Sequence, residues 1–323
     1  MSSSHPSYLA CVAQAAPVYL DLAKSVDKAQ TLIAQAAREG AKFIAFPEVW
    51  LPGYPWWIWL DDPSWADRQG LRQLFQEQAL RANSDELAAI ARSAADHGMH
   101  VLMGAAERDD ERLYISQWLI DDAGQIRMHR RKLKPGPIEL KVFSEGGHRD
   151  LAVVDTALGR IGALACAEHR HPLFKHALHL QHETLHVAAW PSFPLKNIPH
   201  MPSAQTFLAL SRSYAFEGGC YVLAPCAPVT PDVVARLCDT PKKSDCLQAG
   251  GGYAQIFAPN GEPLCTPLPP TEEGLLYAQI DPQKSIAARQ AFDLSGHSAR
   301  SDVVRLQGPA DLSAPAGSSG VTP

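Results

Sequence analysis

Hydrophobic residues in the first half of the chain alternate between short continuous runs and segments with helical spacing. The runs predict buried strands, and the spaced segments predict helices that begin at a capping residue such as Ser84 or end before a glycine. The predicted elements are strands over residues 8–15, 42–46, 100–106 and 113–121, helices over residues 26–39 and 85–97, a Trp-, Pro- and Gly-rich loop over residues 50–65 and a turn at Ala123-Gly124.

The second half continues this alternation with more closely spaced strands. It predicts paired strands over residues 151–154 and 160–166, further strands over 185–190, 220–224, 253–258 and 274–280, and helices over 173–181 and 203–217. The last two strands flank a turn at Asn260-Gly261. This order predicts a layered α/β fold, and the tight turns between adjacent strands favour mixed sheets over purely parallel ones.

The composition is that of a globular protein with a large core. The chain has 323 residues, of which 46% are hydrophobic, and no Gly/Ser-rich or charged linker divides residues 1–306. We therefore expect a single domain over residues 1–306. Residues 307–323 are rich in Pro, Gly, Ala and Ser, which predicts a disordered C-terminal tail.

Charge and cysteine content narrow the class of protein further. The formal net charge of −5 argues against nucleic acid or an anionic membrane as a partner. No stretch reaches the roughly 18 apolar residues of a membrane span, and the N-terminus lacks the basic and apolar regions of a signal peptide. The seven cysteines are odd in number and do not have zinc-knuckle spacing, which favours reduced thiols in a cytoplasmic protein.

Glu48 is the first of three reactive side chains that follow predicted strands, where a rigid scaffold can hold them in place. It comes after the apolar run 42–46 and Pro47, so the carboxylate should be partly desolvated. Desolvation raises the pKa of a carboxyl group, which suits a general base. Taken alone, a helix cap or a loop salt bridge is the more common use of a glutamate.

A basic run over residues 129–134 contains the second candidate, Lys132. Taken alone, the run predicts a solvated strand end. A functional interpretation needs one ammonium group that turns inward and stabilises a developing negative charge. Lys132 and Lys134 would share a face if the strand continued to Pro135.

Cys166 is the third candidate, at the end of the strand 160–166 and before a helix that follows Pro172. A helix N-terminus lowers the pKa of a thiol, and its free backbone N–H groups can bind an oxyanion. The alternative is a buried structural thiol, the most common fate of a free cysteine.

Four histidines follow this cysteine at spacings of three and four residues: His176, His179, His182 and His186. The spacing makes a metal site conceivable, but no carboxylate completes a recognisable ligand set, so we expect no metal. A helix face that packs against another subunit is the preferred interpretation.

The three segments together resemble the nitrilase superfamily, whose catalytic residues are Glu, Lys and Cys in that chain order. Residues 46–59, 130–135 and 162–173 resemble the segments around these residues, residues 187–193 the strand that follows, and residues 293–303 the C-terminal signature. The resemblance covers residues 8–306. It implies a four-layer α-β-β-α sandwich with two mixed sheets, assembled as a homodimer or a larger spiral homo-oligomer.

Two departures from the family pattern bear on the substrate. After the lysine the family usually has Pro-Thr-His-X-Glu-Arg, whereas residues 135–140 read Pro-Gly-Pro-Ile-Glu-Leu. The second glutamate is kept as Glu139, which by resemblance orients Lys132 or shares in proton transfer. Ala167 stands where many members carry Trp, which opens space for a bulky group and resembles the arylacetonitrile-hydrolysing branch.

The resemblance implies an enzyme that hydrolyses a small-molecule nitrile to the carboxylic acid and ammonia, with some amide as by-product. Glu48 would be the base, Cys166 the nucleophile, and Lys132 with the backbone N–H of Ala167 would stabilise the tetrahedral intermediate. The nucleophile, the base and the cation are all side chains, so no cofactor is expected. An amidase or carbamoylase on the same fold, a cyanide-degrading enzyme and a catalytically inactive binding scaffold are the alternatives.

Three aromatic residues are candidates for the wall of the acyl pocket: Tyr54, Trp57 and Trp190. Aromatic side chains offer flat apolar surface to a ring-bearing substrate. Ordinary core packing is the alternative for each of them.

Overall fold

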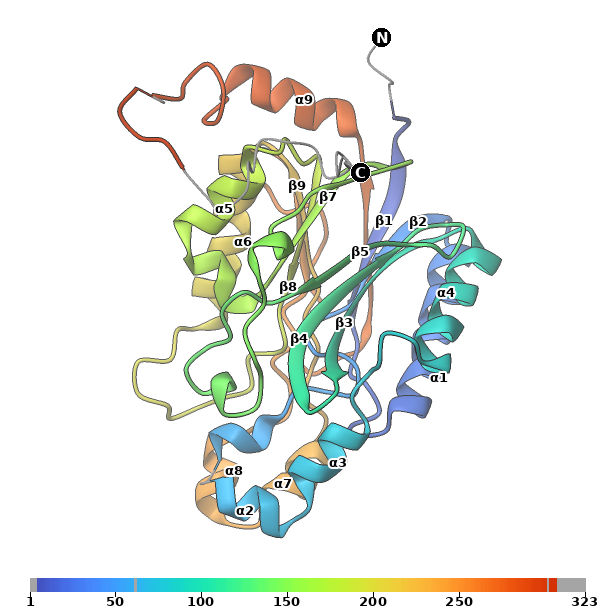
Figure 1. Ribbon diagram of the computed structural model, residues 1–323, viewed down its shortest axis with the longest axis vertical. Helices are drawn as coiled ribbons and strands as arrows, with labels where there is room; N and C mark the ends of the chain where they lie inside the picture. Colours follow the sequence, from blue (N-terminus) through green and yellow to red (C-terminus); the bar gives the residue numbers. More distant parts are fainter. Residues whose placement is uncertain (1–4, 61–62, 301, 307–323) are drawn as a thin grey trace, which may run out of the picture.

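Two sheets form the centre of the computed structural model, which describes residues 5–60, 63–300 and 302–306 (Figure 1). The six-stranded sheet has the order β11-β1-β2-β3-β4-β5, with β1 (Tyr8–Gln14), β2 (Ala41–Ala45), β3 (His100–Asp109), β4 (Arg112–Ile120), β5 (Ile126–Arg131) and β11 (Gly274–Ile280). The five-stranded sheet has the order β10-β9-β8-β7-β6, with β6 (Val154–Thr156), β7 (Gly159–Ala165), β8 (Leu185–Ala189), β9 (Tyr221–Ala224) and β10 (Gln255–Phe257). Each sheet has both parallel and antiparallel neighbours, so the prediction of mixed sheets is confirmed.

Helices lie on the outer face of each sheet, which gives four layers (Figure 1). α1 (Leu22–Arg38) and α4 (Asp85–His97) pack against the six-stranded sheet, and α5 (Pro172–His179) and α6 (Ala204–Gly218) against the five-stranded sheet. Apolar side chains from the two sheets, such as Val12, Phe43 and Ile161, share one buried cluster. The predicted α-β-β-α sandwich is therefore confirmed.

Capping side chains set the limits of the two long helices on the six-stranded sheet. α1 begins earlier than predicted because the Asp21 side chain accepts a hydrogen bond from the Lys24 amide at 3.0 Å. α4 has the predicted limits, with the Ser84 hydroxyl accepting from the Leu87 amide at 3.2 Å and Gly98 at φ +58°. Buried residues recur at helical spacing in both helices, so one face of each meets the sheet.

The remaining helices are short, and the hydrophobic pattern did not predict them. They are α2 (Pro63–Arg68), α3 (Leu71–Glu77), α7 (Pro231–Leu237), α8 (Pro241–Cys246), α9 (Pro282–Ala291) and 3-10 helices over Trp56–Trp59, Glu139–Lys141, His148–Asp150 and Cys166–Arg170. Most of the α-helices in this group begin at a proline, whose fixed φ suits the first helical turn. The predicted loop over residues 50–65 therefore contains the first of these 3-10 helices and the start of α2.

The strands on either side of Asn260-Gly261 belong to different sheets. β10 pairs with β9 in the five-stranded sheet, whereas β11 pairs with β1 in the six-stranded sheet. A single domain over residues 1–306 stays a prediction, and the tail predicted over residues 307–323 lies outside the described residues. None of the helices in the described part of the chain is long and apolar enough to cross a membrane.

Candidate active site

Glu48 lies in a tight turn directly after β2 and is 2% exposed. The turn is tied to both sheets, since the Phe46 amide donates to the Leu102 carbonyl at 2.8 Å and the Glu48 amide to the Trp190 carbonyl at 3.3 Å. Gly104 on β3 allows the turn to approach closely, because a Cβ there would lie 2.0 Å from the Pro47 carbonyl oxygen. The sequence-predicted carboxylate is therefore buried at the end of a strand.

Lys132 is the first residue after β5, and its side chain turns into the same region. Its ammonium donates to Glu48 Oε1 at 2.6 Å and to Glu139 Oε2 at 2.8 Å. Glu139 also accepts from the Tyr54 hydroxyl at 2.8 Å and from the Gly136 amide at 2.6 Å. The structure thus joins Glu48, Lys132 and Glu139 in one buried group, which we call the charged cluster.

Lys134 does not belong to this cluster. β5 ends at Arg131, so the strand does not reach Pro135 and the two lysines do not share a strand face. The Lys134 side chain is half exposed and pairs with Glu145. The expectation of a shared face is wrong because the chain leaves the sheet one residue before Lys132.

Cys166 follows β7 and opens a 3-10 helix, with its backbone at φ +45°. This left-handed conformation is uncommon outside glycine and costs about 1–3 kcal/mol. Burial and the carboxylate of Glu48 raise the pKa of the thiol, and Lys132 and the Ala167 N–H only partly oppose them. The expected lowering of the thiol pKa by a helix N-terminus is therefore wrong, because burial outweighs the local dipole.

The charged cluster holds two carboxyl groups and a single ammonium group. Burial raises the pKa of Glu48 to about 8, as predicted from its position, although Lys132 opposes this shift. Burial disfavours the charged form of Lys132, yet Glu139 and Glu48 raise the pKa of its ammonium. Lys132 holds the pKa of Glu139 below its usual value despite burial. The cluster therefore keeps an ammonium, a carboxylate and a proton acceptor close to the Cys166 thiol.

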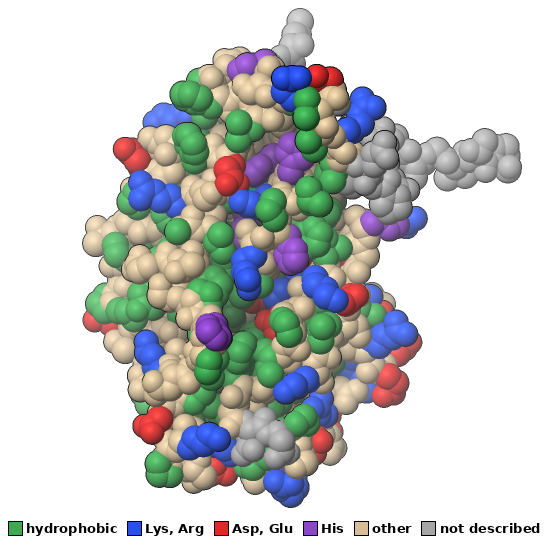
Figure 2. Space-filling view, turned by 90° about the vertical axis from the view of Figure 1, so that its left-hand side faces the viewer, with side chains coloured by type: hydrophobic (Ala, Val, Ile, Leu, Met, Phe, Trp, Pro, Cys, Tyr) green, Lys and Arg blue, Asp and Glu red, His purple; other side chains and the backbone are tan. Residues whose placement is uncertain are grey.

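An open pocket of about 470 Å³ leads to Cys166. Tyr54, Glu139, Cys166 and Ala167 line it, and the rest of the wall is mainly apolar, with Trp59, Ile138, Phe193, Leu195, Met201 and Phe207 among its residues. Figure 2 shows the side of the molecule on which the segment between β8 and α6 lies, where hydrophobic side chains gather around a hollow with Lys and Arg at its edges. Such a pocket suits a substrate with an apolar body.

Two of the predicted pocket residues do not line this pocket. Trp57 packs edge-on against Phe75, with ring centroids 5.1 Å apart. Trp190 is fully buried, and its indole N–H donates to the Ser211 hydroxyl at 2.9 Å. The core-packing alternative holds for both, whereas Tyr54 and Ala167 do face the pocket.

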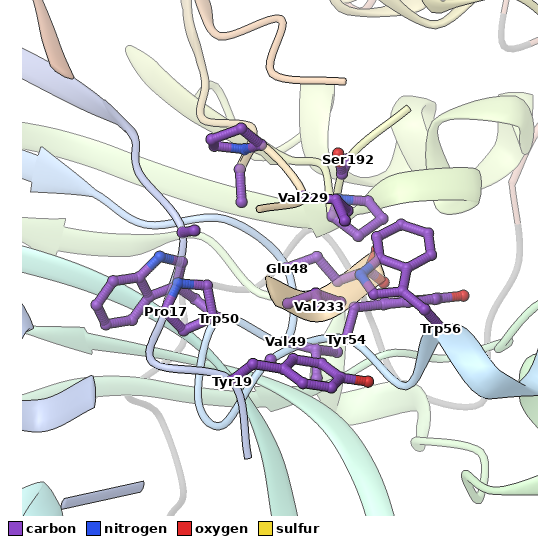
Figure 3. A pocket seen from close by; sticks show the side chains of 15 residues that line it. Pro17, Tyr19, Glu48, Val49, Trp50, Tyr54, Trp56, Ser192, Val229 and Val233 are labelled. Carbon is purple, nitrogen blue, oxygen red and sulfur yellow. The ribbon is translucent and has the colours of Figure 1, made fainter. Parts of the chain in front are cut away.

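A second, much smaller cavity of about 20 Å³ lies beside Glu48. Figure 3 shows Glu48 among the side chains around it, with its carboxylate directed to the side where Tyr54 and Trp56 lie. Glu48 Oε2 is buried and has no hydrogen-bond partner among the described residues. This space is about what one water molecule needs, next to an oxygen that is free to accept a proton.

The histidine group is not a metal centre in the described part of the chain, where no three His, Cys, Asp or Glu side chains are placed to hold an ion. His179 and His186 are buried, and their rings lie 4.5 Å and 3.8 Å from that of Tyr214. The expectation that they pack against another subunit is wrong for these two residues, because α6 covers them within the chain.

The chain is similar in sequence to one protein family and to several known enzymes. The model of the carbon–nitrogen hydrolase family matches residues 9–290. A nitrilase of Pseudomonas syringae is 49% identical over 93% of this chain and 89% of its own length. An aliphatic nitrilase of Rhodococcus rhodochrous is 41% identical over 91% of this chain and 80% of its own. An arylacetonitrilase of Aspergillus niger is 41% identical over 91% and 87%.

Solved structures agree on the fold. The crystal structure of a carbon–nitrogen hydrolase from Helicobacter pylori superposes with a TM-score of 0.71, at 18% identity, over 92% of this chain and 97% of its own. At this identity the likeness bears on the fold alone.

Proposed function

The chain belongs to the carbon–nitrogen hydrolase family, in its nitrilase branch, and we propose that it hydrolyses an organic nitrile to the carboxylic acid and ammonia. The observation that carries this proposal is the position of the Cys166 thiol, which lines a mainly apolar pocket and interacts electrostatically with Glu48 and Lys132. A thiol, a base and a cation close together are the groups that covalent hydrolysis needs.

The first step is the attack of sulfur on the nitrile carbon. Ionised Glu48 accepts the thiol proton of Cys166 on Oε2, the oxygen to which no other described residue forms a hydrogen bond. A C–S bond forms as one carbon–nitrogen π bond breaks, and the proton passes to nitrogen, which gives a thioimidate. The positive charge of Lys132 stabilises the Glu48 carboxylate from which this proton transfer starts.

Two waters complete the reaction. The first adds to the thioimidate carbon with Glu48 as base, and Lys132 and the N–H of Ala167 stabilise the tetrahedral intermediate. Protonated nitrogen leaves as ammonia, so a thioester remains. A second water then cleaves the C–S bond, which releases the carboxylic acid and restores the thiol. If sulfur leaves before nitrogen is protonated, the product is the amide.

The pocket supports a bulky substrate, of the arylaceto class or another. The small side chain of Ala167 lies next to the nucleophile and leaves room for a ring, and aromatic residues such as Phe193 and Tyr54 offer surfaces for it. The relatives include both an arylacetonitrilase and an aliphatic nitrilase at the same identity, so the class rests on the pocket.

The alternatives on the same fold are an amidase or a carbamoylase, and the charged cluster would serve either. A cyanide-degrading enzyme fits less well, because a large apolar pocket offers nothing to so small a substrate. An inactive scaffold fits less well still, because it has no use for a buried cluster of Glu48, Lys132 and Glu139 next to a thiol.

Product analysis with the purified protein tests the proposal. We expect ammonia and phenylacetic acid from phenylacetonitrile, and a faster reaction than with phenylacetamide. Hydrolysis of the amide alone would replace the nitrilase assignment by an amidase, and no turnover of either would favour the scaffold.

We also propose that the protein is cytoplasmic and assembles as a homodimer or a larger spiral. All seven cysteines are free, which suits a reducing compartment. Exposed apolar side chains gather near α5, α6 and α9, where the rings of Phe216 and Phe292 lie 6.3 Å apart. Light scattering of the purified protein would give the size of the assembly.

A further inference from the structure

A row of buried polar side chains leads from the backbone of the nucleophile, and none of them lines the pocket. His169 Nδ1 lies 2.9 Å from the Cys166 carbonyl oxygen, and His169 Nε2 lies 3.0 Å from His186 Nε2. His186 Nδ1 lies 3.0 Å from Glu183 Oε2, and the Tyr214 hydroxyl donates to Glu183 Oε1. We call these four side chains, none of which takes part in the mechanism above, the imidazole row.

The direction of every hydrogen bond in the row follows from its first member. A carbonyl oxygen can only accept, so His169 carries its proton on Nδ1 and, as a neutral ring, accepts at Nε2. His186 must then donate from Nε2, and as a neutral ring it accepts at Nδ1. The remaining donor to that nitrogen has to be Glu183, which is possible only if its carboxyl group is protonated.

We infer that Glu183 is a neutral carboxylic acid that donates to His186, and that the imidazole row thereby fixes the peptide between Cys166 and Ala167. The residues of the row are positioning residues, since none of them touches the pocket. The inference about their effect on turnover rests on the proposed function, whereas the protonation of Glu183 does not.

The surroundings of Glu183 favour its neutral form. Its side chain is 1% exposed and lies against the backbone of Gly162 on β7, where a Cβ would come within 2.1 Å of Oε2. Burial raises the pKa of Glu183 to about 7, and it lowers the pKa of His169 to about 3, so both imidazoles of the row are neutral.

The other charged and titratable groups around Glu183 do not offset the effect of burial on its pKa, although Arg289 lowers it. They are His179 on α5, Tyr214 on α6, His186 on β8, Cys220 before β9 and Arg289 on α9. Burial lowers the pKa of His179 to about 4, which leaves it neutral. Arg289 uses a guanidinium N–H on the Glu183 backbone carbonyl, at 2.7 Å, and the carboxyl group receives no ion pair from it.

The imidazole row can orient the Ala167 N–H because a peptide unit is planar. In a trans peptide the carbonyl of one residue and the N–H of the next point in opposite directions. A hydrogen bond that fixes the Cys166 carbonyl therefore aims the Ala167 N–H, which lies within reach of the Cys166 sulfur. Cys166 is held at φ +45°, a conformation that needs such support. The row acts on the oxyanion through this peptide.

Two substitutions at one position test the inference. Glu183→Gln reproduces a neutral acid, because its amide N–H₂ can donate to His186 while its oxygen accepts from Tyr214. Glu183→Leu has a similar size and no donor. We expect Glu183→Gln to retain most of the wild-type kcat and Glu183→Leu to lose about 10- to 100-fold in kcat with little change in KM, because the oxyanion contact exists only in the transition state.

Infrared spectroscopy reports the proton directly and needs no substrate. The difference spectrum of wild type minus Glu183→Gln, recorded just below neutral pH, should contain the carbonyl stretch of a protonated buried carboxyl group. Glu217→Gln is the matched control, since Glu217 lies on α6 and pairs with Lys175 outside the row. It should leave this band and the kcat unchanged.

Each outcome bears on a different statement. If Glu183→Gln loses as much activity as Glu183→Leu and the band is absent, Glu183 is a carboxylate and the inference is overturned. If the band is present but Glu183→Leu keeps its kcat, the row does not position the peptide. If wild type turns over no nitrile while the band is present, the proposed function fails and the protonation of Glu183 stands.

Discussion

Two buried glutamates near Cys166, Glu48 and Glu183, differ in the groups that surround them. Glu48 sits in the charged cluster, with an ammonium 2.6 Å away and an oxygen that has no hydrogen-bond partner in the described part of the chain. Glu183 sits in the imidazole row, where neutral rings and a phenol use both of its oxygens. Burial raises the pKa of both. The difference teaches that burial alone does not make a glutamate reactive: a nearby cation and a free oxygen do.

The Cys166 thiol is the first group to test, because the charged cluster and the imidazole row are both proposed to act on it. Cys166→Ala should lower kcat by at least about 10⁴-fold and leave the fold intact, because the nucleophile is lost while little volume changes. Ammonia release and the thermal unfolding temperature would measure both effects. Cys11→Ala, a buried thiol on β1 away from the site, should keep its activity. Unchanged turnover in Cys166→Ala would refute the nucleophile.

Glu48→Gln should lower kcat by about 10²- to 10⁴-fold, the usual contribution of a general base. The amide keeps the shape of the side chain but cannot take the thiol proton. Steady-state kinetics with phenylacetonitrile would measure the loss. Glu107→Gln is a suitable control, since Glu107 is equally buried but pairs with Arg131 and His129 away from the pocket. If Glu48→Gln kept the wild-type rate as Glu107→Gln does, Glu48 would not be the base and the charged cluster would have only a structural role.

The pH dependence of kcat/KM tests the ionisation of Glu48 in the charged cluster. Glu48 acts as a base only when ionised, and burial raises its pKa to about 8, so kcat/KM should rise as pH increases through about 8. The carboxylate of Glu139 adds to this shift. Glu139→Gln should therefore move the rise to lower pH, and lower kcat by about 10- to 100-fold because Lys132 loses a charge-assisted hydrogen bond. A profile that does not move in this variant would show that another group controls the rise.

Ala167 joins both regions, since its N–H belongs to the peptide fixed by the imidazole row and its side chain faces the pocket. Ala167→Trp should fill space beside the nucleophile and lower kcat/KM for phenylacetonitrile by about 10-fold, with a smaller effect on a short aliphatic nitrile. The ratio of the two values is the measurement, and the aliphatic substrate is its own control. An equal loss on both would mean that the peptide, and not the pocket, had changed.

Three of the reactive residues could be predicted because each follows a strand, whereas Glu139 was identified only by the family resemblance. Glu48, Lys132 and Cys166 come after apolar runs or strand ends, and a strand end fixes where a side chain begins. The direction of the Glu48 pKa shift follows from that position, whereas the shift of Cys166 does not. Its sign is set mainly by the burial of the thiol, and then by the Glu48 carboxylate, both of which come from packing against distant segments.

The residues that line the pocket and those of the imidazole row could not be predicted, because neither set follows from the spacing of residues along the chain. Residues 50–65 have no period, so nothing in the sequence tells that Tyr54 faces the pocket while Trp57 turns toward Phe75. The imidazole row joins side chains from the 3-10 helix after Cys166, from β8 and its preceding turn, and from α6. The spacing of the histidines along the chain made a metal site conceivable and a subunit contact preferred, but the partners of His179 and His186 come from other elements of the same chain.

Gly104 has no side chain that could react, yet the position of the turn that presents Glu48 depends on it. With only 2.0 Å between a hypothetical Cβ and the Pro47 oxygen, even alanine would displace the turn that presents Glu48. A saturation screen that scores enzyme activity should therefore find this site as intolerant as the nucleophile itself. Libraries built to broaden the range of accepted nitriles would do well to leave it untouched and vary the pocket wall instead.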